Sequence, residues 1–191
     1  MYMKKIYQVS SSVLFLLSLS FSLLAQNSFF TPVSESAVSL VNSNRVIIPV
    51  KYNTVKADMD QLKNFLRTLP SEKNVTQSLA PIMQIPMPDG RMVRFRVWES
   101  SIQSPALEAR YPEIRTFAGQ GIDDPYANIR FDIGPRGFHA QVLTVNGTYY
   151  IDPYAVGNNT DYISYFRKDL MNNKGNWSCD VPDYTPKQTG N

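Results

Sequence analysis

The sequence is poor in the two residue types that most often build catalytic and metal sites. Among 191 residues there is one cysteine, Cys179, and one histidine, His139. A single cysteine excludes an internal disulfide framework. One histidine and one cysteine, with no His-Glu-x-x-His motif, cannot supply the three protein ligands of a catalytic zinc site. On its own residues the chain is predicted to be no enzyme and to hold no cofactor.

Charge is also modest. Lysine and arginine total 19 and aspartate and glutamate total 16, which gives a formal net charge of +3. Loss of Lys4 and Lys5 with the leader described below subtracts two charges and leaves +1. This balance gives no argument for nucleic acid as a partner, because nucleic-acid binding needs a basic surface.

The N-terminal apolar run is too short for a membrane span of about 20 residues. Lys4 and Lys5 precede residues 13–25, VLFLLSLSFSLLA, a run interrupted by serines. A basic start, a short apolar stretch and a small residue at its end are typical of a secretory signal peptide. We therefore expect a signal peptide over 1–25, cleaved after Ala25. The mature chain is expected to be secreted, directly or through the periplasm, with no stable membrane anchor.

The rest of the chain divides into a folded body, 26–170, and a tail, 171–191, predicted to be a flexible linker. Residues 26–43 are polar and Ser-rich and are expected to form a loose arm. Residues 45–52 are predicted to be a strand, with Pro49 indicating an edge position. The apolar spacing from Met59 to Leu69 then predicts one amphipathic helix, with Asp58 as N-cap and Pro70 as stop.

The centre of the chain predicts a three-stranded antiparallel meander, over 127–133, 138–145 and 148–154. A tight turn at 134–137 places apolar residues opposite one another: Ile133 with Phe138, Phe131 with Ala140, and Ile129 with Val142. A second turn at Asn146-Gly147 pairs Val142 with Ile151, Gln141 with Asp152, and His139 with Tyr154. The fold class is therefore mostly β (α+β): an antiparallel sheet of hairpins with one amphipathic helix packed on it.

Another hairpin is predicted around Pro88-Asp89-Gly90, with Gly90 at positive φ. The hydrophobic pattern pairs Met87 with Val93, Ile85 with Phe95, and Met83 with Val97. Arg94, Arg96 and Trp98 then share the other face and form a candidate interface, since Arg and Trp are enriched at binding hot spots. Residues 104–111 are expected to add a helical turn, and 161–166 a last short strand.

The predicted register also places polar side chains in rungs on the outer face of the meander. Asp132, His139 and Tyr154 form one rung, and Arg130, Gln141 and Asp152 form the next. An Asp–His pair can orient a base, but neither neighbouring strand offers a Ser or Cys nucleophile at that level. We interpret these six residues as a structural polar ladder; a hydrolase using Asp132 and His139 is a third and weaker reading.

The central run is more specific than any of these motifs. Residues 109–143, ARYPEIRTFAGQGIDDPYANIRFDIGPRGFHAQVL, together with GTYYIDPY at 147–154, resemble the N-terminal propeptide of bacterial secreted zinc metalloproteases of the reprolysin-like class. The resemblance extends to IPMPDGRMVRFRVWES at 85–100 and YISYFRKD at 162–169, so that it covers roughly 44–170. The sequence stops before the catalytic domain with HExxHxxGxxH that normally follows such a propeptide.

The resemblance implies a non-catalytic module that keeps a metalloprotease latent and assists its folding. Its partner would be the zinc metalloprotease catalytic domain, in cis or in trans, and this chain would be a fragment or truncated form of the full enzyme. In related zymogens a propeptide thiolate binds the catalytic zinc, a role that Cys179 could take. Ser178-Cys179-Asp180-Val181 differs from the Pro-x-x-Cys-Gly pattern of animal members, and the alternative is an incidental free thiol.

A different class of function also fits the sequence. The chain could be a stand-alone exported binding module, either a protease inhibitor acting in trans or a surface adhesion domain. The face of Arg94, Arg96 and Trp98 would then be its natural interface.

Overall fold

A computed structural model describes residues 27–38 and 44–170. The predicted signal peptide, the tail 171–191 and Cys179 lie outside the described residues. Within the described part, no helix is long and apolar enough to cross a membrane.

The described residues form one antiparallel sheet of nine strands, in the order β1-β2-β9-β8-β7-β6-β5-β4-β3. The prediction of a mostly β fold built from hairpins is confirmed. Strands β3 to β9 follow one another as a meander, and β2 pairs with the last of them, β9. The strands are β1 (Phe30–Pro32), β2 (Asn53–Ala57), β3 (Ile82–Pro86), β4 (Met92–Glu99), β5 (Arg115–Gly121), β6 (Asn128–Gly134), β7 (Gly137–Thr144), β8 (Gly147–Pro153) and β9 (Asp161–Phe166).

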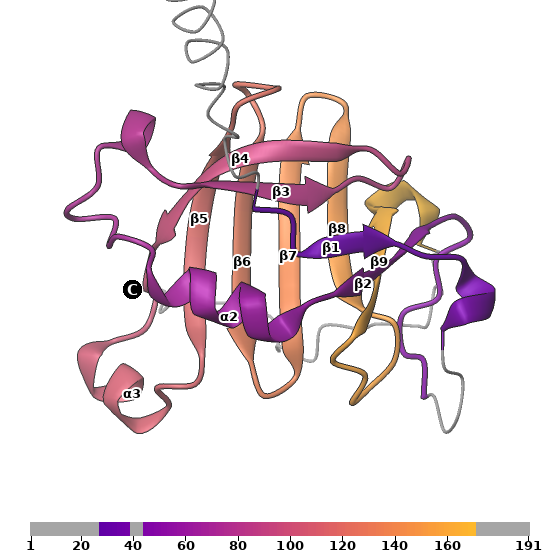
Figure 1. The fold of residues 1–191 in the computed structure, drawn as a ribbon, viewed down its shortest axis with the longest axis horizontal. Coiled ribbons are helices and arrows are strands. Elements are labelled where there is room, and N and C mark those ends of the chain that lie inside the picture. The colour runs from indigo at the N-terminus through magenta and orange to yellow at the C-terminus, as the bar shows by residue number, and fades with distance from the viewer. Residues whose placement is uncertain (1–26, 39–43, 171–191) are drawn as a thin grey trace, which may run out of the picture.

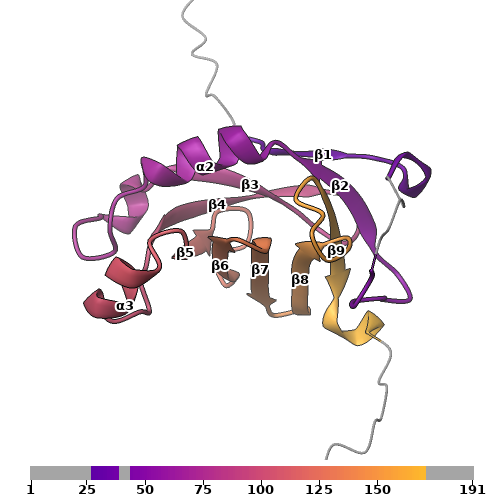
Figure 2. The ribbon, with the colours of Figure 1, turned by 90° about the horizontal axis from the view of Figure 1, so that it is seen from below.

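The sheet curls until its two edges almost meet. Asn27, which precedes β1, forms a parallel bridge with Met83 of β3, and the backbone N–H of Gln84 donates to the Asn27 carbonyl at 3.1 Å. Seen from below, β1, β2 and β3 form one layer and β5 to β9 the opposite layer (Figure 2). The space between the layers holds the core.

The predicted amphipathic helix is α2 (Met59–Arg67). It lies beside β1 and β3 and crosses in front of β5, β6 and β7 (Figure 1). Asp58 caps it by accepting a hydrogen bond from the Gln61 backbone N–H at 3.0 Å. Leu62 and Leu66 are buried in the interior of the sheet, so the helix fills the gap that the curled sheet leaves open.

The core is rich in aromatic rings. Phe117 and Phe131 stack with centroids 4.9 Å apart, and Phe138 packs edge-on against Tyr162 at 6.3 Å. These rings come from four strands and bury large apolar areas, which is the main stabilising contribution in a domain of this size. The expected helical turn at 104–111 is present as α3 (Pro105–Arg110), on the surface.

The first predicted hairpin is confirmed in register. Ile133 pairs with Phe138 and Phe131 with Ala140, and Gly137 takes a positive φ of 103° at the turn.

In the hairpin of β3 and β4, Gly90 has the predicted positive φ of 90°. There the register differs from the prediction by two residues: Ile85 pairs with Val93 and Met83 with Phe95. A shift of two keeps every side chain on its predicted face, because side chains alternate along a strand.

Two expectations for the N-terminal half are wrong. Residues 45–52 form no strand: Val46 and Ile48 are exposed, while Pro49 makes an isolated bridge to Leu170. The β-strand of this region is β2, which begins at Asn53. The Ser-rich stretch is no loose arm where it is described, because Phe29 and Phe30 are buried and β1 pairs with β2.

Candidate functional site

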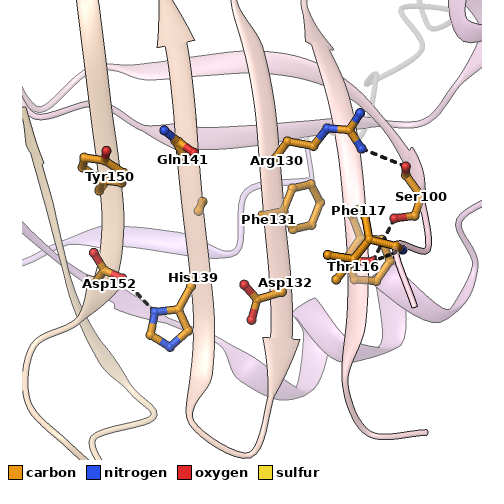
Figure 3. A pocket seen from close by; sticks show the side chains of 12 residues that line it. Ser100, Thr116, Phe117, Arg130, Phe131, Asp132, His139, Gln141, Tyr150 and Asp152 are labelled. Carbon is orange, nitrogen blue, oxygen red and sulfur yellow. Dashed lines mark hydrogen bonds and ion pairs between the residues drawn. The ribbon is translucent and has the colours of Figure 1, made fainter. Parts of the chain in front are cut away.

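Two rows of side chains cross the outer face of the sheet, the face turned away from α2 (Figure 3). They alternate with core residues such as Phe131 and Ala140, as the pleat of a strand requires. The first row, from β5 to β8, contains Thr116, Asp132, His139 and Asp152; the second, from β6 to β8, contains Arg130, Gln141 and Tyr150.

The second predicted turn is displaced, and this changes the membership of both rows. Gly147 pairs with Thr144, so the turn is centred on Val145 and Asn146 rather than on Asn146 and Gly147. The Thr144 hydroxyl holds this turn by donating to the Gly147 carbonyl at 2.8 Å and accepting from the Asn146 N–H at 3.1 Å. All pairs between β7 and β8 therefore move by two residues.

The consequences for the predicted ladder are specific. Asp132 with His139 and Arg130 with Gln141 are confirmed as cross-strand pairs. Tyr154 is not the neighbour of His139, and Asp152 is not the neighbour of Gln141. Asp152 lies beside His139 instead.

His139 is held in a fixed orientation. Its Nδ1 lies 2.7 Å from Oδ1 of Asp152, and the Tyr165 hydroxyl donates to Oδ2 of the same carboxylate at 2.7 Å. An ionised carboxylate offers only acceptors, so Nδ1 carries the proton in this bond. The bond to Asp152 raises the pKa of His139, and burial raises that of Tyr165. Asp152 thus fixes the tautomer and the orientation of the imidazole.

Asp132 stands on the other side of His139 and is less well satisfied. Its carboxylate makes no hydrogen bond or ion pair within residues 27–38 and 44–170. Partial burial raises its pKa, while the charge of His139 opposes that rise. The side chain is therefore a desolvated carboxylate that lacks a direct partner in the described part of the chain.

Arg130, on the next rung, is also fixed without an opposite charge. Its Nη1 donates to the Ser100 hydroxyl at 2.8 Å, and that hydroxyl donates in turn to Glu72. No ion pair involving Arg130 occurs among the described residues. The outer face therefore presents a positive and a negative side chain two residues apart on β6.

These side chains line an open hollow of about 530 Å³ on the outer face (Figure 3). Its lining combines these charged and polar groups with apolar side chains, among them Phe117, Phe131 and Ile102, and Ile102 is 78% exposed. Concave sites with a few convergent polar groups are the usual locations of ligand and partner binding.

The described residues do not assemble a nucleophile beside His139. Thr116 lies two strands away, roughly 10 Å at about 4.8 Å per strand. Its hydroxyl donates to the Ser100 carbonyl at 2.8 Å. The hydroxyl of Ser100 is engaged by Arg130 and Glu72. The geometry gives binding groups rather than an arrangement for nucleophilic catalysis.

The predicted interface of Arg94, Arg96 and Trp98 is largely occupied by the protein itself. Trp98 is 5% exposed and packs with Ala80, so its expected exposure is wrong. Arg96 donates to the Ala80 carbonyl at 3.2 Å, and Arg94 forms an ion pair of 2.6 Å with Asp123. The loop that includes Ala80 lies over this part of the sheet, which no local pattern indicated.

A second polar cluster was not expected from the sequence. The Arg45 guanidinium lies over the rings of Tyr154 and Tyr52, at 4.1 and 5.0 Å, and donates to both hydroxyls. Glu35 accepts hydrogen bonds from the same hydroxyls. The bond from Tyr52 lowers the pKa of Glu35, and burial raises that of Tyr154 to about 12. The cluster fastens the chain around Glu35 and Arg45 to Tyr154, which follows β8.

Candidate metal ligands are few. Within residues 27–38 and 44–170, no three His, Cys, Asp or Glu side chains are grouped to hold a metal ion. Cys179, the predicted ligand to a partner's zinc, lies outside the described residues.

Comparison of the chain with profiles of protein families, with characterised proteins and with solved structures gives no significant match. The resemblance to metalloprotease propeptides therefore stays a prediction that depends on the residues quoted above.

Proposed function

We propose that this chain is the non-catalytic propeptide of a secreted zinc metalloprotease of the reprolysin-like class. It keeps the catalytic domain latent, assists its folding and is removed by proteolysis. Zinc belongs to the catalytic domain, which is the partner. The observation that carries the proposal is the outer face of β5–β8: a hollow with fixed charges that the described part of the chain leaves open.

The position of the resembling residues supports a separable module. Residues 85–100, 109–143, 147–154 and 162–169 include nearly all of strands β4 to β9, together with the turns from β5 to β6 and from β6 to β7. These strands enclose a core with α2 and β2. A unit with its own core can fold before a catalytic domain and then act as a template or cover for it.

The charges on the outer face support a role in docking. The Ser100 hydroxyl holds Arg130 in place, and neither Arg130 nor Asp132 forms an ion pair among the described residues. Fixed charges exposed in a hollow favour a partner of complementary potential, and they give specificity and orientation more than affinity. In the proposal, this face meets the rim of the substrate cleft.

Cys179 gives the proposal a second element. It follows Leu170 by nine residues, which fully extended reach at most roughly 30 Å. Zn²⁺ favours the deprotonated thiol, and a fourth protein ligand closes a catalytic site to the attacking water. Cys179 would thus block the metal while the sheet covers the cleft.

The decisive experiment begins with the gene. The native locus is sequenced past codon 191, and any catalytic domain with HExxHxxGxxH in frame or nearby is expressed with and without this chain. We expect peptidase activity to be inhibited by the chain, and Arg130→Glu to weaken the inhibition about tenfold or more. Lys63→Glu, on the exposed surface of α2 and so on the other side of the sheet, is the matched control. A catalytic domain that folds alone and is unaffected by the chain would sink the proposal.

The second candidate is a stand-alone exported binding module, an inhibitor in trans or an adhesion domain. It is favoured by the same hollow, whose described lining is complete without Cys179. A stop codon after Asn191 with no metalloprotease domain nearby would support this reading over the propeptide.

A further inference from the structure

We propose that the hollow of the outer face binds an extended segment of a partner protein in which an acidic and a basic side chain are two residues apart. The acidic side chain contacts Arg130, and the basic one contacts Asp132. This site is part of the proposed docking face, so the identity of the partner, the catalytic domain, rests on the proposed function. The residues that bind the segment all belong to this chain.

Two parts of the chain cover the outer face on either side of the hollow. On β4 and β5, Trp98 and Ala118 are buried together with Ala80, which precedes β3. On β9, Ile163 is buried in a cluster against which Ile47 packs. The hollow of about 530 Å³ lies between these covered regions, and its lining includes outward side chains of β6 and β7 (Figure 3). An extended segment therefore has room to lie along these two strands.

Arg130 offers a binding group for a carboxylate. It is exposed, and its guanidinium makes one hydrogen bond in the described part of the chain, from Nη1 to the Ser100 hydroxyl at 2.8 Å. Glu72 accepts from the same hydroxyl but forms no ion pair with Arg130. A guanidinium has five N–H donors in a planar fork that matches a carboxylate. The bond to Ser100 therefore orients the fork and leaves donors for an acidic ligand.

Asp132 offers the opposite charge. It is partly buried, and its carboxylate makes no hydrogen bond or ion pair among the described residues. Burial raises its pKa, while the charges of His139 and Arg136 lower it from a distance. His139 is itself engaged by Asp152 and by the backbone of Arg136. A lysine or arginine of the partner would give the Asp132 carboxylate the direct partner that the described residues do not supply.

The spacing of the two charges defines the shape of the ligand. Arg130 and Asp132 are two residues apart on β6, so their side chains leave the same face of the strand roughly 6.5–7 Å apart. An extended segment repeats its own same-face side chains at the same distance. Adjacent residues of such a segment point to opposite faces, and in a helix residues two apart do not face one another either. An acidic and a basic residue two apart in an extended segment therefore meet both charges at once.

The test uses the full chain and a capped synthetic peptide, Val-Thr-Glu-Thr-Lys-Thr-Val, at low ionic strength, where screening is weakest. A peptide of the same composition with the charges adjacent, Val-Thr-Glu-Lys-Thr-Thr-Val, is the comparison. Binding is followed by the backbone NMR signals of Arg130 and Asp132 and by the imidazole signals of His139, the one histidine of the chain. We expect saturable shifts, with the spaced peptide binding about two- to fivefold more tightly, the effect of one exposed ion pair.

Charge exchange tests the pairing directly. Arg130→Glu and Asp132→Lys should each weaken binding of the spaced peptide about five- to tenfold, because repulsion replaces an attraction. The double variant carrying both changes should bind the reversed peptide, Val-Thr-Lys-Thr-Glu-Thr-Val, about as tightly as the parent binds the first. Lys63→Glu and Asp60→Lys, on the exposed surface of α2, are the matched controls and should bind as the parent does. Thermal unfolding of each variant establishes that it is folded.

The proposal is overturned if the spaced peptide at millimolar concentration shifts none of these signals, or if the two spacings bind equally. It is also overturned if the folded double variant binds neither order of charges. Because these measurements contain no protease, their failure leaves inhibition of the catalytic domain to be judged by its own assay. Intact peptide binding without inhibition would instead overturn the propeptide proposal and keep the site.

Discussion

His139 and Asp152 are joined across β7 and β8, with 2.7 Å between Nδ1 and Oδ1, although they are thirteen residues apart in the chain. The carboxylate favours the charged imidazole and raises the pKa of His139 above the ordinary 6.5. Asp152→Asn should therefore lower the pKa of His139, as followed by NMR of the imidazole in metal-free buffer. Asp60→Asn should leave it unchanged. Equal values in Asp152→Asn and the parent would show that the bond is absent in solution.

The same bond links stability to pH in a defined direction. A folded-state pKa above the unfolded value means that the bond contributes fully below about pH 6.5 and is lost as pH rises through the folded pKa. The difference in free energy of unfolding between the parent and Asp152→Asn should be larger at pH 5.5–6 than at pH 9. Urea denaturation of both proteins at roughly pH 6 and pH 9 measures this difference in the free energy of unfolding.

Glu35 should show the opposite dependence. The Tyr52 hydroxyl, helped by Tyr154, lowers its pKa from the ordinary 4.5. Its contribution is therefore present above about pH 4.5 and is lost as pH falls through the folded pKa. Glu35→Gln cannot lose this contribution, so below that pH its free energy of unfolding should fall less steeply with decreasing pH than that of the parent. Urea denaturation measures both. Glu108→Gln, an exposed acid on α3, serves as control.

Gly119 should tolerate no side chain. An added Cβ would lie 2.6 Å from the Arg96 carbonyl oxygen and 2.8 Å from Cγ2 of Ile129. Because the backbone of β4 cannot move aside cheaply, Gly119→Ala should cost about 1–3 kcal/mol in chemical denaturation. At Gly134 the nearest atom is 3.6 Å away, so Gly134→Ala should stay within about 0.5 kcal/mol of the parent. Similar losses for both would contradict the close approach of β4 and β5.

Leu66 tests whether α2 belongs to the core. It is 1% exposed, so Leu66→Ala should lower the free energy of unfolding by about 2–5 kcal/mol. Leu79 is 80% exposed, and Leu79→Ala should change it by less than about 0.5 kcal/mol. A neutral Leu66→Ala would mean that the helix does not pack inside the curled sheet.

Cys179 tests the mechanism of latency. If its thiolate binds the partner's zinc, Cys179→Ala should leave the thermal unfolding of the module unchanged and weaken inhibition of the catalytic domain. Cys179→Ser would behave similarly, since a neutral hydroxyl is a poor zinc ligand. Inhibition by Cys179→Ala equal to that of the parent would rule out the zinc contact while leaving docking by the outer face intact.

Much of the sheet follows from side-chain alternation. Around Gly137 the sequence correctly predicted that Asp132 lies opposite His139, because the short turn and the pairing of apolar residues indicate the same register. Around Gly147 the prediction assigned each side chain to the correct face of the sheet, but the pairs between β7 and β8 differ from the predicted ones by two residues. A shift of two residues does not change the side-chain alternation, so the pattern could not exclude it, and the Thr144 hydroxyl selects the turn that is formed. The predicted register paired His139 with Tyr154, so the sequence did not predict that Asp152 orients His139.

Other features depend on contacts between residues distant in the sequence. β5 contains Gly119 and Gly121, whose missing side chains weaken the strand pattern although they allow close approach of neighbouring backbone. Residues 45–52 alternate like a strand, yet Ile47 and Tyr52 pack on the cluster around Tyr154 and not in a ladder. Tyr165 reaches Asp152 because β8 pairs with β9, and no local sequence pattern predicted that pairing.

The pairing of β2 with β9 also sets an order of events during synthesis. Asn53 meets Ser164 in the finished sheet, so β2 leaves the ribosome long before its partner exists. Until β9 is made, β2 and β8 each keep an open edge that can pair with another chain. Closure between Asn27 and Met83 likewise joins residues far apart in sequence, and such long-range pairing is slow. A nascent chain that ends before Asp161 is therefore the aggregation-prone form, and a chaperone that shields strand edges is most useful at that stage.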